Sequence, residues 1–243
     1  MNINIRLLPL ILIVFVISSS FTSVSPHVKE EKIETIKKDS GLDEEAYRVL
    51  ELYEDFKIKN TSVPQLESFS QAIKGYSKLE ATGRIKNKTL TIIDFSLHSS
   101  KKRLWVLDMQ THKVLFNTVV AHGRNTGLEF AKYFSNTNNS NQSSLGFYIT
   151  GETYYGKNGL SMFLDGQEKG FNNNARKRYV VFHGAKYANP DFVKRNGRLG
   201  RSLGCPAVPT AVNKAIISKI KNKSCLFIYH PNKKYQTSSK LIS

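Results

Sequence analysis

The sequence contains two cysteines, and one of them, Cys205, lies in a loop rich in glycine and arginine, GRLGRSLGCPAVP at residues 197–209. His183 precedes it, at the end of the apolar run RYVVFHG. A thiol becomes an effective nucleophile when a nearby base or the start of a helix lowers its pKa, and the sequence offers both. Gly204 lets backbone N–H groups converge on one oxygen, as an oxyanion hole requires. These residues are compatible with a cysteine nucleophile and a histidine base.

Each of these residues also has an ordinary structural interpretation. A histidine at a strand end commonly serves as a hydrogen-bond partner, a cysteine near a helix start is commonly inert, and loop glycines commonly serve turns. The second cysteine, Cys225, lies in the apolar run SCLFIYH and is expected to be a small buried hydrophobic residue. A disulfide between Cys205 and Cys225 would block the nucleophile, so we expect free thiols. The residues alone leave a structural and a catalytic interpretation open.

The composition indicates a folded, strongly basic protein. Of 243 residues, 40% are hydrophobic and 11% are aromatic, which favours a packed core. Lysine and arginine number 36 against 19 acidic residues, so the formal net charge is +17. Such a charge indicates a polyanionic neighbour, and acidic polymers of the cell envelope fit an exported protein better than nucleic acid does. Because the lysines are scattered along the chain, a simple contribution to solubility stays open as the alternative.

Residues 1–25 have the layout of a secretory signal peptide. Arg6 is followed by an apolar run at residues 7–17 and then by small polar residues. The run is shorter than the roughly 20 apolar residues that a membrane span requires, which makes an uncleaved anchor the less favoured alternative. We therefore expect an exported protein of the periplasm or cell envelope, with no stable membrane span after cleavage. Residues 26–41 are charged, lack periodicity and are interpreted as a linker.

The rest of the chain divides into a helical segment and a β-rich domain. Apolar residues recur at helical spacing in residues 42–83, with acidic residues at the start of the first helix, so we expect an α-helical hairpin there. Short runs rich in β-branched and aromatic residues predict a mainly-β domain at residues 84–232. Residues 233–243 are interpreted as a polar tail.

Two elements of the β-rich domain would position the candidate residues. RYVVFHG predicts a central buried strand that ends at His183. Residues 209–221 have apolar residues at helical spacing and predict a helix directly after the cysteine loop. The polar run SNTNNSNQSS at residues 135–144 is a loop by composition. The candidate base would therefore lie on a rigid strand, and the candidate nucleophile would lie between a loop and a helix.

The segment HGA followed by GRLGRSLGCPAVP resembles the signature of the L,D-transpeptidases, the YkuD-type enzymes that remodel bacterial peptidoglycan. More narrowly, it is similar to their murein L,D-transpeptidase branch, which has a Ser-x-Gly-Cys-Pro active-site loop. LTIIDFS, RLWVLD, VVAHGRNTG, SSLGFYITGETYYGKNGLS and LDG also resemble that branch, so the likeness runs over most of residues 84–230. It implies a mainly-β catalytic domain, a β-sandwich or mixed sheet with a short helix after the active-site loop, preceded by the α-helical hairpin.

The resemblance implies roles for individual residues. Cys205 matches the nucleophile and His183 matches the general base, whose imidazole is oriented by the backbone carbonyl of Gly184. Ser202 matches the Ser or Thr that opens the motif. The backbone N–H groups that match the oxyanion hole are those of Leu203, Gly204 and Cys205. No metal or other cofactor is implied.

The chain departs from the commoner family pattern beside the nucleophile. Leu203 stands where that pattern has histidine, and Pro206 and Ala207 follow the cysteine where it has Asn or Arg. A backbone N–H donor needs no particular side chain, so an oxyanion hole is compatible with Leu203. Substrate contacts made by the missing side chains cannot be carried over.

Other residues are candidates for contacts in the substrate cleft. They are Arg198, Arg201, His122, Tyr187 and Arg178. The first two arginines flank the nucleophile and suit the carboxylates of stem peptides, with solvated loop residues as an equal alternative. The histidine, in VVAHGR, ends an apolar strand and either lines the cleft or replaces His183 as the base. We prefer His183 as the base because the register of His183 relative to Cys205 matches that of the family it resembles. The tyrosine and the last arginine are weaker candidates.

The resemblance implies a two-step acyl transfer on peptidoglycan stem peptides. The Cys205 thiolate attacks the carbonyl of the third stem residue and expels the terminal D-alanine, and an amine of a neighbouring stem then attacks the thioester to form a 3→3 cross-link. With water as the acceptor, the same site would be an L,D-carboxypeptidase. A non-catalytic peptidoglycan-binding module is an alternative from another class. A zinc peptidase is disfavoured because its candidate ligands, His122, His183 and Cys205, lack short paired spacing.

Overall fold

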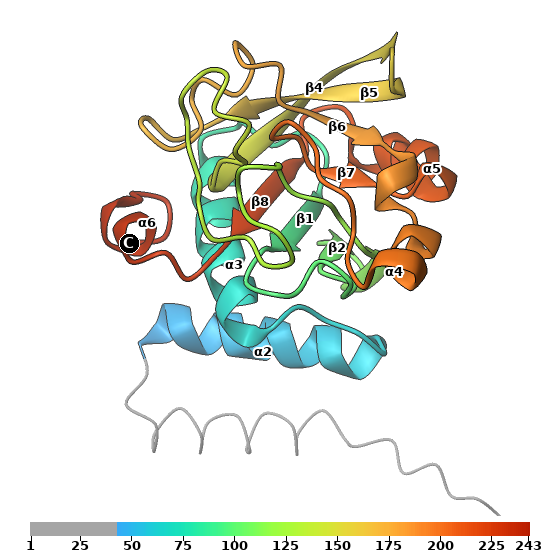
Figure 1. Cartoon of the computed structure of the whole chain (residues 1–243). Helices are drawn as coiled ribbons and strands as arrows, with labels where there is room; N and C mark the ends of the chain where they lie inside the picture. The colour runs from blue at the N-terminus through green and yellow to red at the C-terminus, as the bar shows by residue number, and fades with distance from the viewer. Residues whose placement is uncertain (1–42) are drawn as a thin grey trace, which may run out of the picture. The chain divides into compact units, whose positions relative to one another are not determined.

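Figure 1 shows the computed structural model, which describes residues 43–243. The expected signal peptide at 1–25 and linker at 26–41 lie outside the described residues. The described chain begins with two helices, α2 (Glu44–Lys59) and α3 (Leu66–Ala81), as the helical spacing predicts. Acidic residues in the first turn of α2 and lysines in its last turn complement the partial charges at the two ends of the helix.

Eight strands form one mixed sheet in the order β3-β2-β1-β8-β4-β5-β6-β7. Two pairs are parallel, β1 with β8 and β6 with β7, and the others are antiparallel. The bounds are β1 (Thr89–Asp94), β2 (Leu104–Asp108), β3 (Lys113–Thr118), β4 (Gly146–Gly156), β5 (Gly159–Gly166), β6 (Val181–Gly184), β7 (Ala207–Val208) and β8 (Cys225–Tyr229). A mainly-β mixed sheet that follows a helical pair confirms the predicted fold class.

The sheet curves back on itself beside the cysteine loop. The segment after edge strand β3 forms an isolated bridge from Ala121 to Ala207, which belongs to the opposite edge strand, β7. Ala121 N donates to Ala207 O at 2.8 Å. A second bridge joins Gly123 to Ser202. Both ends of the loop that carries Cys205 are therefore tied to the same segment.

The sequence predicts that strand β6 is buried and central. It is buried at all four positions, but it is not central. It is the last strand but one, between β5 and the short strand β7. Helix α5 (Thr210–Ile220), which follows the cysteine loop as predicted, packs against β6 and covers it. An apolar run indicates that a strand is buried, but not how. A covering helix buries a strand just as a central position in the sheet does. Two short helices, η1 (Lys186–Ala188) and α4 (Pro190–Asn196), connect β6 to the loop.

Helix α3 packs directly against the sheet. Gly75 lies so close to Phe147 of β4 that a Cβ at this position would be 2.1 Å from the ring Cζ atom. Phe147 in turn stacks on Phe227 of β8, with ring centroids 4.2 Å apart. On the other side of α3, Phe69 meets Phe56 of α2 edge-on at 5.6 Å. The two helices therefore extend the core of the sheet.

The segment at 233–243, which the sequence presents as a polar tail, contains α6 (Lys233–Ser238) and a buried tyrosine. Asn232 caps this helix by accepting a hydrogen bond from Tyr235 N at 3.0 Å. The Tyr235 ring packs edge-on against Phe171, and its hydroxyl donates to Glu168 at 2.9 Å. One aromatic residue fixes the segment although its composition is polar.

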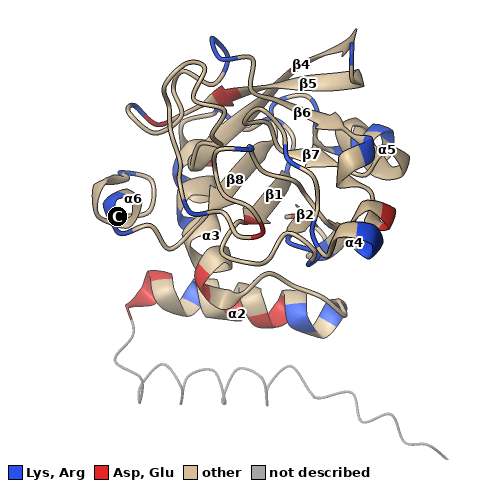
Figure 2. Cartoon of the chain, viewed as in Figure 1, with Lys and Arg blue, Asp and Glu red and all other residues tan. Residues whose placement is uncertain are grey.

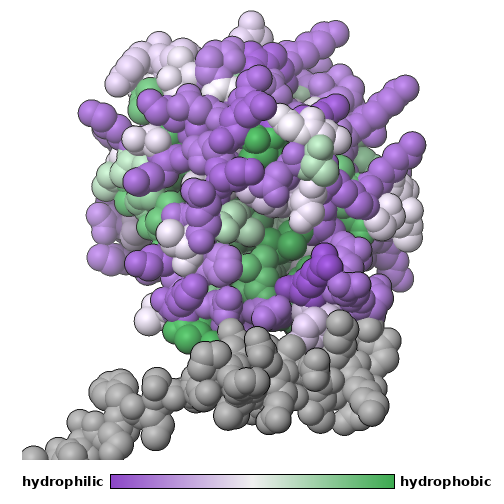
Figure 3. Space-filling model, turned by 180° about the vertical axis from the view of Figure 1, so that it is seen from behind, coloured by the Kyte–Doolittle hydropathy of each residue, from purple (hydrophilic) through white to green (hydrophobic). Residues whose placement is uncertain are grey.

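The basic residues are spread over the molecule. Figure 2 shows Lys and Arg on helices, strands and loops, while acidic residues gather mainly on α2. The face seen from behind in Figure 3 is mostly hydrophilic, with hydrophobic side chains gathered in its lower centre. Between residues 43 and 243, no helix has the length and apolar character needed to cross a membrane.

Candidate active site

His183 lies on the buried strand β6 and has one ring nitrogen committed to the backbone. The residue is 3% exposed, and its Nδ1 lies 2.9 Å from the carbonyl oxygen of Gly184. Because only a protonated Nδ1 can donate to that carbonyl, the neutral ring keeps its lone pair on Nε2. Burial lowers the pKa of His183 below its usual value, so the imidazole is neutral at neutral pH. Such a ring can accept a proton at Nε2.

Cys205 is half-buried, and its thiol is held by the segment that leads into β6. Val181 N donates to Sγ at 3.4 Å, and the thiol donates to the carbonyl oxygen of Tyr179 at 3.5 Å. In the described chain the thiol makes no hydrogen bond to His183. The two residues are nevertheless neighbours in the sheet, because His183 pairs with Ala207, two residues after the cysteine.

Ser202 holds the loop in shape directly before the cysteine. Its Oγ accepts from Gly204 N at 3.0 Å and donates to Cys205 O at 2.6 Å. The N–H of Gly204, one of the three expected oxyanion donors, is therefore occupied by Ser202. The N–H groups of Leu203 and Cys205 donate to no other residue in the described part of the chain. These two N–H groups are the ones available to an incoming oxygen.

The polar loop at residues 135–144 forms a wall against the nucleophile loop. Gly204 has φ +129°, and a Cβ added there would lie 2.9 Å from Gln142 O. Ser143 Oγ donates to Gly204 O at 3.0 Å and accepts from Gly123 N at 3.0 Å. Glycine at 204 is thus required both by its backbone conformation and by this contact.

Arg178 connects the polar loop to the nucleophile. Its guanidinium donates to Ser135 O at 2.7 Å, to Ser144 Oγ at 2.5 Å and to Gln142 O at 2.7 Å. One of its terminal nitrogens lies 3.6 Å from the position that a Cβ on Gly204 would take. The charge of this guanidinium lies near the neighbouring thiol.

Two opposing effects act on the pKa of Cys205. Burial raises it, while the Val181 N–H and the positive charge of Arg178 lower it. Burial is the largest effect, so the resting thiol is protonated, and the cation and the N–H group favour the thiolate once the proton leaves. The sequence presents Arg178, the first residue of the RYVVFHG run, only as a weaker candidate for contacts in the substrate cleft. Its contacts come from a loop distant in the chain, so no sequence signal ranks it above the other arginines.

His122 is not placed to act as the base. It is 1% exposed; its Nδ1 accepts from Arg103 at 2.8 Å, and its Nε2 donates to Gly127 O at 3.2 Å. Burial and the charge of Arg103 lower the pKa of His122 to about 3. Both nitrogens are therefore occupied by the core. Of the two histidines, only His183 keeps a ring nitrogen without a hydrogen-bond partner in the part of the chain that the structure describes.

The remaining candidates for the substrate cleft are two arginines and Tyr187, and the arginines are bound to the backbone. Arg201 donates to Arg124 O at 3.2 Å and to Gly127 O at 3.4 Å, and Arg198 donates to Leu199 O at 2.9 Å. Both arginines thus bond backbone carbonyls. Tyr187 is half-buried and packs against the nucleophile loop, where its Cβ lies 2.4 Å from a Cβ added at Gly200.

The cysteines are both free, and Cys225 is fully buried on β8. Burial raises the pKa of Cys225. Cys205 is therefore the more accessible and the more readily ionised of the two thiols. Over residues 43–243, there is no group of three or more His, Cys, Asp or Glu side chains arranged to hold a metal ion.

A comparison with known proteins shows which family the chain matches. A sequence model of the L,D-transpeptidase catalytic domain matches residues 60–229, which is more than half of the chain. No curated protein matches the chain.

Several solved structures are similar to the chain. An L,D-transpeptidase from Mycobacterium smegmatis is 10% identical with a TM-score of 0.37, over 59% of this chain and 59% of that chain. A cysteine-to-serine mutant of the Enterococcus faecium L,D-transpeptidase is 14% identical with a TM-score of 0.34, over 60% of this chain and 50% of that chain. An L,D-transpeptidase from Stackebrandtia nassauensis is 14% identical with a TM-score of 0.35, over 84% and 90% of the two chains. The match thus spans less than two thirds of the first two proteins.

Proposed function

This chain belongs to the L,D-transpeptidase catalytic-domain family, and on that premise we propose that it is a peptidoglycan L,D-transpeptidase that works through a cysteine thioester. The acyl donor is a tetrapeptide stem that ends in D-alanine. The observation that carries the proposal is the state of His183. Its Nδ1 is bound to Gly184 O at 2.9 Å, its Nε2 has no hydrogen-bond partner among residues 43–243, and its strand lies in register with the strand that follows Cys205.

The first step forms the acyl-enzyme. The thiol of Cys205 leaves the carbonyl of Tyr179 and gives its proton to Nε2 of His183. The thiolate sulfur attacks the carbonyl carbon of the third stem residue and forms a C–S bond. The oxyanion that results accepts hydrogen bonds from the N–H groups of Leu203 and Cys205. When it collapses, the bond to the D-alanine nitrogen breaks, and the imidazolium gives its proton to that nitrogen.

The second step transfers the acyl group. An amine of a neighbouring stem attacks the thioester carbonyl and passes a proton to the neutral imidazole of His183. The C–S bond breaks, the thiolate of Cys205 leaves, and a new amide forms the 3→3 cross-link. The protein recovers its starting state when the imidazolium returns its proton to the thiolate. The thioester conserves the energy of the amide that was cleaved, so no further energy source is needed.

Arg178 acts in this scheme as a positioning residue with an electrostatic effect. Its positive charge favours the thiolate form of Cys205, which burial disfavours. Its hydrogen bonds to Gln142 O and Ser135 O hold the polar loop against the nucleophile loop. The first effect favours the thiolate, and the second fixes the position of the guanidinium that provides it.

Water and amines compete for the same thioester. If water attacks, the product is a tripeptide stem and the activity is that of an L,D-carboxypeptidase. No residue described above selects between the two acceptors, so the proposal names the amine and leaves the product mixture to test it. We place the reaction outside the cytoplasmic membrane, in the periplasm or cell envelope, because the substrate is there and because residues 1–25 have the layout of a signal peptide.

The test is the intact mass of the protein after incubation with purified disaccharide-tetrapeptide. We expect a covalent adduct equal to the substrate minus D-alanine on the wild type and on Cys225→Ala, and none on Cys205→Ala. Cys225 is fully buried on β8, so its substitution controls for the loss of a thiol. If neither D-alanine nor an adduct is formed while all three proteins bind the substrate, the protein is a peptidoglycan-binding module.

A further inference from the structure

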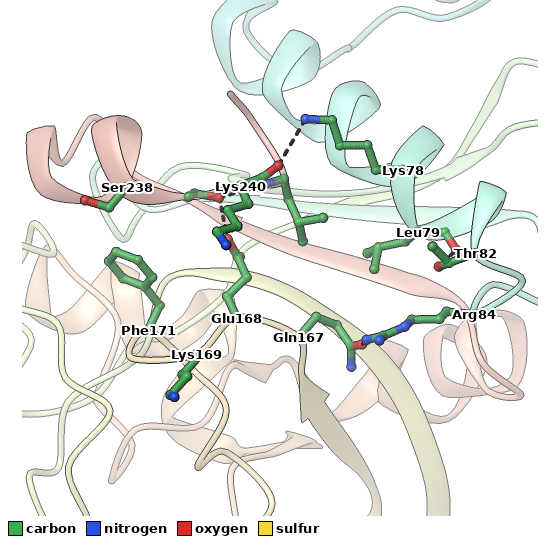
Figure 4. Close-up of a pocket in the computed structure, with 12 residues that line it drawn as sticks. Lys78, Leu79, Thr82, Arg84, Gln167, Glu168, Lys169, Phe171, Ser238 and Lys240 are labelled. Carbon is green, nitrogen blue, oxygen red and sulfur yellow. Dashed lines mark hydrogen bonds between the residues drawn. The ribbon is translucent and has the colours of Figure 1, made fainter.

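A cavity of about 520 Å³ lies apart from the candidate active site (Figure 4). Three separate parts of the chain line it: the last turn of α3 with the residues after it, the loop that follows β5, and the end of α6 with the segment after it. None of its lining residues belongs to the site around Cys205 and His183. The cavity is within the range of volumes that hold small organic ligands.

Specific hydrogen bonds fix the walls of this cavity. Arg84 donates to Gln167 Oε1 at 2.6 Å, which joins the end of α3 to the loop after β5. Lys78 donates to Lys240 O at 3.0 Å, which joins α3 to the C-terminal segment. Glu168 accepts from Ser239 Oγ and so joins the other two walls. The cavity is therefore formed before any ligand enters.

The charges that line the cavity are unbalanced. Four lining residues are basic: Lys78, Arg84, Lys169 and Lys240. None of the four makes an ion pair with an acidic side chain in residues 43–243, but Lys78 is bound to the backbone oxygens of Lys240 and Ser243. Arg84, Lys169 and Lys240 are the three cations that remain for a ligand. Glu168 is the single acidic lining residue, and it is 7% exposed.

Glu168 is used by the protein itself. One oxygen accepts from Phe147 N at 2.8 Å and from the Tyr235 hydroxyl at 2.9 Å, and the other accepts from Ser239 Oγ. Burial raises the pKa of this carboxyl. Burial thus disfavours its charged form, and its oxygens are committed to donors of the protein and not to the cations around the opening.

We propose that this cavity binds a phosphate ester. The unpaired cations of Arg84, Lys169 and Lys240 suit a group that carries several acceptor oxygens and one or two negative charges, and an arginine fork matches phosphate geometry. Apolar atoms of Leu79 and Phe171 also line the cavity, so a bound ester also has a surface for its carbon chain. Such an ester is found on envelope phosphodiester polymers and on anionic lipid headgroups. The inference is independent of the chemistry at Cys205.

The test titrates the full chain with sn-glycerol 3-phosphate and follows binding by isothermal titration calorimetry. The variant combines Arg84→Gln, Lys169→Gln and Lys240→Gln. The matched control combines Lys101→Gln, Lys113→Gln and Lys214→Gln, three exposed lysines outside the cavity that remove the same total charge. We expect saturable one-site binding, a loss of affinity of at least fivefold in the cavity variant, and a change of less than twofold in the control. Circular dichroism establishes that both variants are folded.

Two further measurements identify the ester and its source. Sedimentation with vesicles of phosphatidylglycerol and phosphatidylcholine, against phosphatidylcholine alone, detects a lipid headgroup; binding of the soluble ester without vesicle preference assigns a soluble or polymeric phosphate. The proposal is overturned if the ester shows no saturation up to roughly 10 mM, well above a millimolar Kd. It is also overturned if the control loses as much affinity as the cavity variant, or if acetate binds as tightly as the ester. Cys205→Ala should bind the ester unchanged, so failure here and failure of the transpeptidase proposal are separate results.

Discussion

His183 and Ala207 are paired across the parallel strands β6 and β7, so the imidazole sits at a fixed register from the thiol two residues before Ala207. Ala207 is also bridged to Ala121, which prevents β7 from sliding along β6. The proposed base is therefore held by the sheet, while Cys205 lies where the loop enters β7. The thiol, now bonded to the carbonyl of Tyr179, is the part that must turn when substrate enters.

Replacing the base tests this arrangement most directly. His183→Gln keeps a polar side chain of similar length but cannot take the thiol proton. We expect the rate of acyl-enzyme formation to fall by about 10²–10⁴-fold, the usual contribution of general acid–base catalysis. The measurement is the time course of the covalent adduct by intact mass.

The control for this variant is His122→Gln. Because both nitrogens of His122 are bound in the core, to Arg103 and to Gly127, this variant should melt at a lower temperature. Its folded fraction should acylate within tenfold of the wild type. If His122→Gln abolished acylation and His183→Gln did not, the assignment of the base would be reversed.

Removal of the Arg178 cation should move the thiol pKa upward. A positive charge lowers the pKa of the Cys205 thiol because it favours the thiolate, so Arg178→Gln should raise that pKa. Alkylation by iodoacetamide proceeds through the thiolate. Its pH profile should therefore shift to higher pH, and the rate below the pKa should fall.

Arg176→Gln is the matched control for this shift. Arg176 lies two residues earlier and bonds Glu152 and Asp165, at 2.9 and 3.0 Å from one of its nitrogens. It is not among the groups that affect the pKa of Cys205. Its substitution should leave the alkylation profile in place. Equal shifts in the two variants would mean that general charge, and not the position of Arg178, controls the thiol.

A methyl group at Gly204 should disturb the nucleophile loop. Gly204→Ala puts a Cβ 2.9 Å from Gln142 O at a φ of +129°, so either the loop or its neighbour must move. A displacement of about 1 Å in a catalytic group can reduce the rate by roughly 10²-fold, and we expect a loss of this size in acylation. Gly197→Ala also has a positive φ, +71°, but no atom within 4 Å. It should lower stability by about 1–2 kcal/mol and leave acylation of the folded protein intact.

The sequence predicts most of the local features and few of the long-range contacts. The αα pair, the mainly-β texture and the helix after the cysteine loop follow from apolar periodicity, because each is set by neighbours in the chain. Cys205 and His183 can be proposed as site residues from the sequence because each lies in a short motif. The contacts of Arg178 with residues 135–144 cannot be read in this way, since they depend on how a distant loop folds.

Burial of polar groups is the other feature that the sequence does not reveal. Nothing in VVAHGR indicates that His122 is held between Arg103 and Gly127. The neighbouring residues in the sequence therefore do not distinguish a candidate base from a structural histidine. The segment at 233–243 is polar in composition, yet Tyr235 binds Glu168 in the core. Arg103 is 19 residues from His122 in the chain, and Glu168 is 67 residues from Tyr235.

A single methyl group on α3 should destabilise the core. Gly→Ala within a helix normally stabilises it, but Gly75→Ala would put a Cβ 2.1 Å from the Phe147 ring. We expect a loss of about 2 kcal/mol in the free energy of unfolding, as for other overpacked cores. Urea denaturation measures it. Ser77→Ala, at an exposed position of the same helix, should change stability by less than about 0.5 kcal/mol. A stable Gly75→Ala would show that α3 can move away from the sheet.

The free energy of unfolding of the wild type, relative to that of an uncharged variant at Glu168, should be greatest in acid. Burial raises the folded-state pKa of this carboxyl above its unfolded value, so between the two pKa values the folded state binds more protons than the unfolded state. The contribution of Glu168 to stability is therefore complete below the unfolded pKa of about 4.5 and is lost as the pH rises through the folded pKa. Glu168→Gln has no such titration. The wild type should lose stability relative to this variant between pH 4 and pH 7, as measured by urea denaturation at both values.

A third variant separates the titration from the loss of hydrogen bonds. The amide of Glu168→Gln keeps one oxygen for Phe147 N and the Tyr235 hydroxyl, and its NH₂ group can donate to Ser239 Oγ, so all three contacts can be kept with the direction of the last one reversed. Glu168→Ala removes the acceptors of all three donors. It should lose about 2–4 kcal/mol at either pH, because buried donors without acceptors are costly. If the difference between the wild type and Glu168→Gln instead grew in favour of the wild type as the pH rose, the carboxylate would be more stable inside the protein than in water, and burial could not be the dominant effect on its pKa.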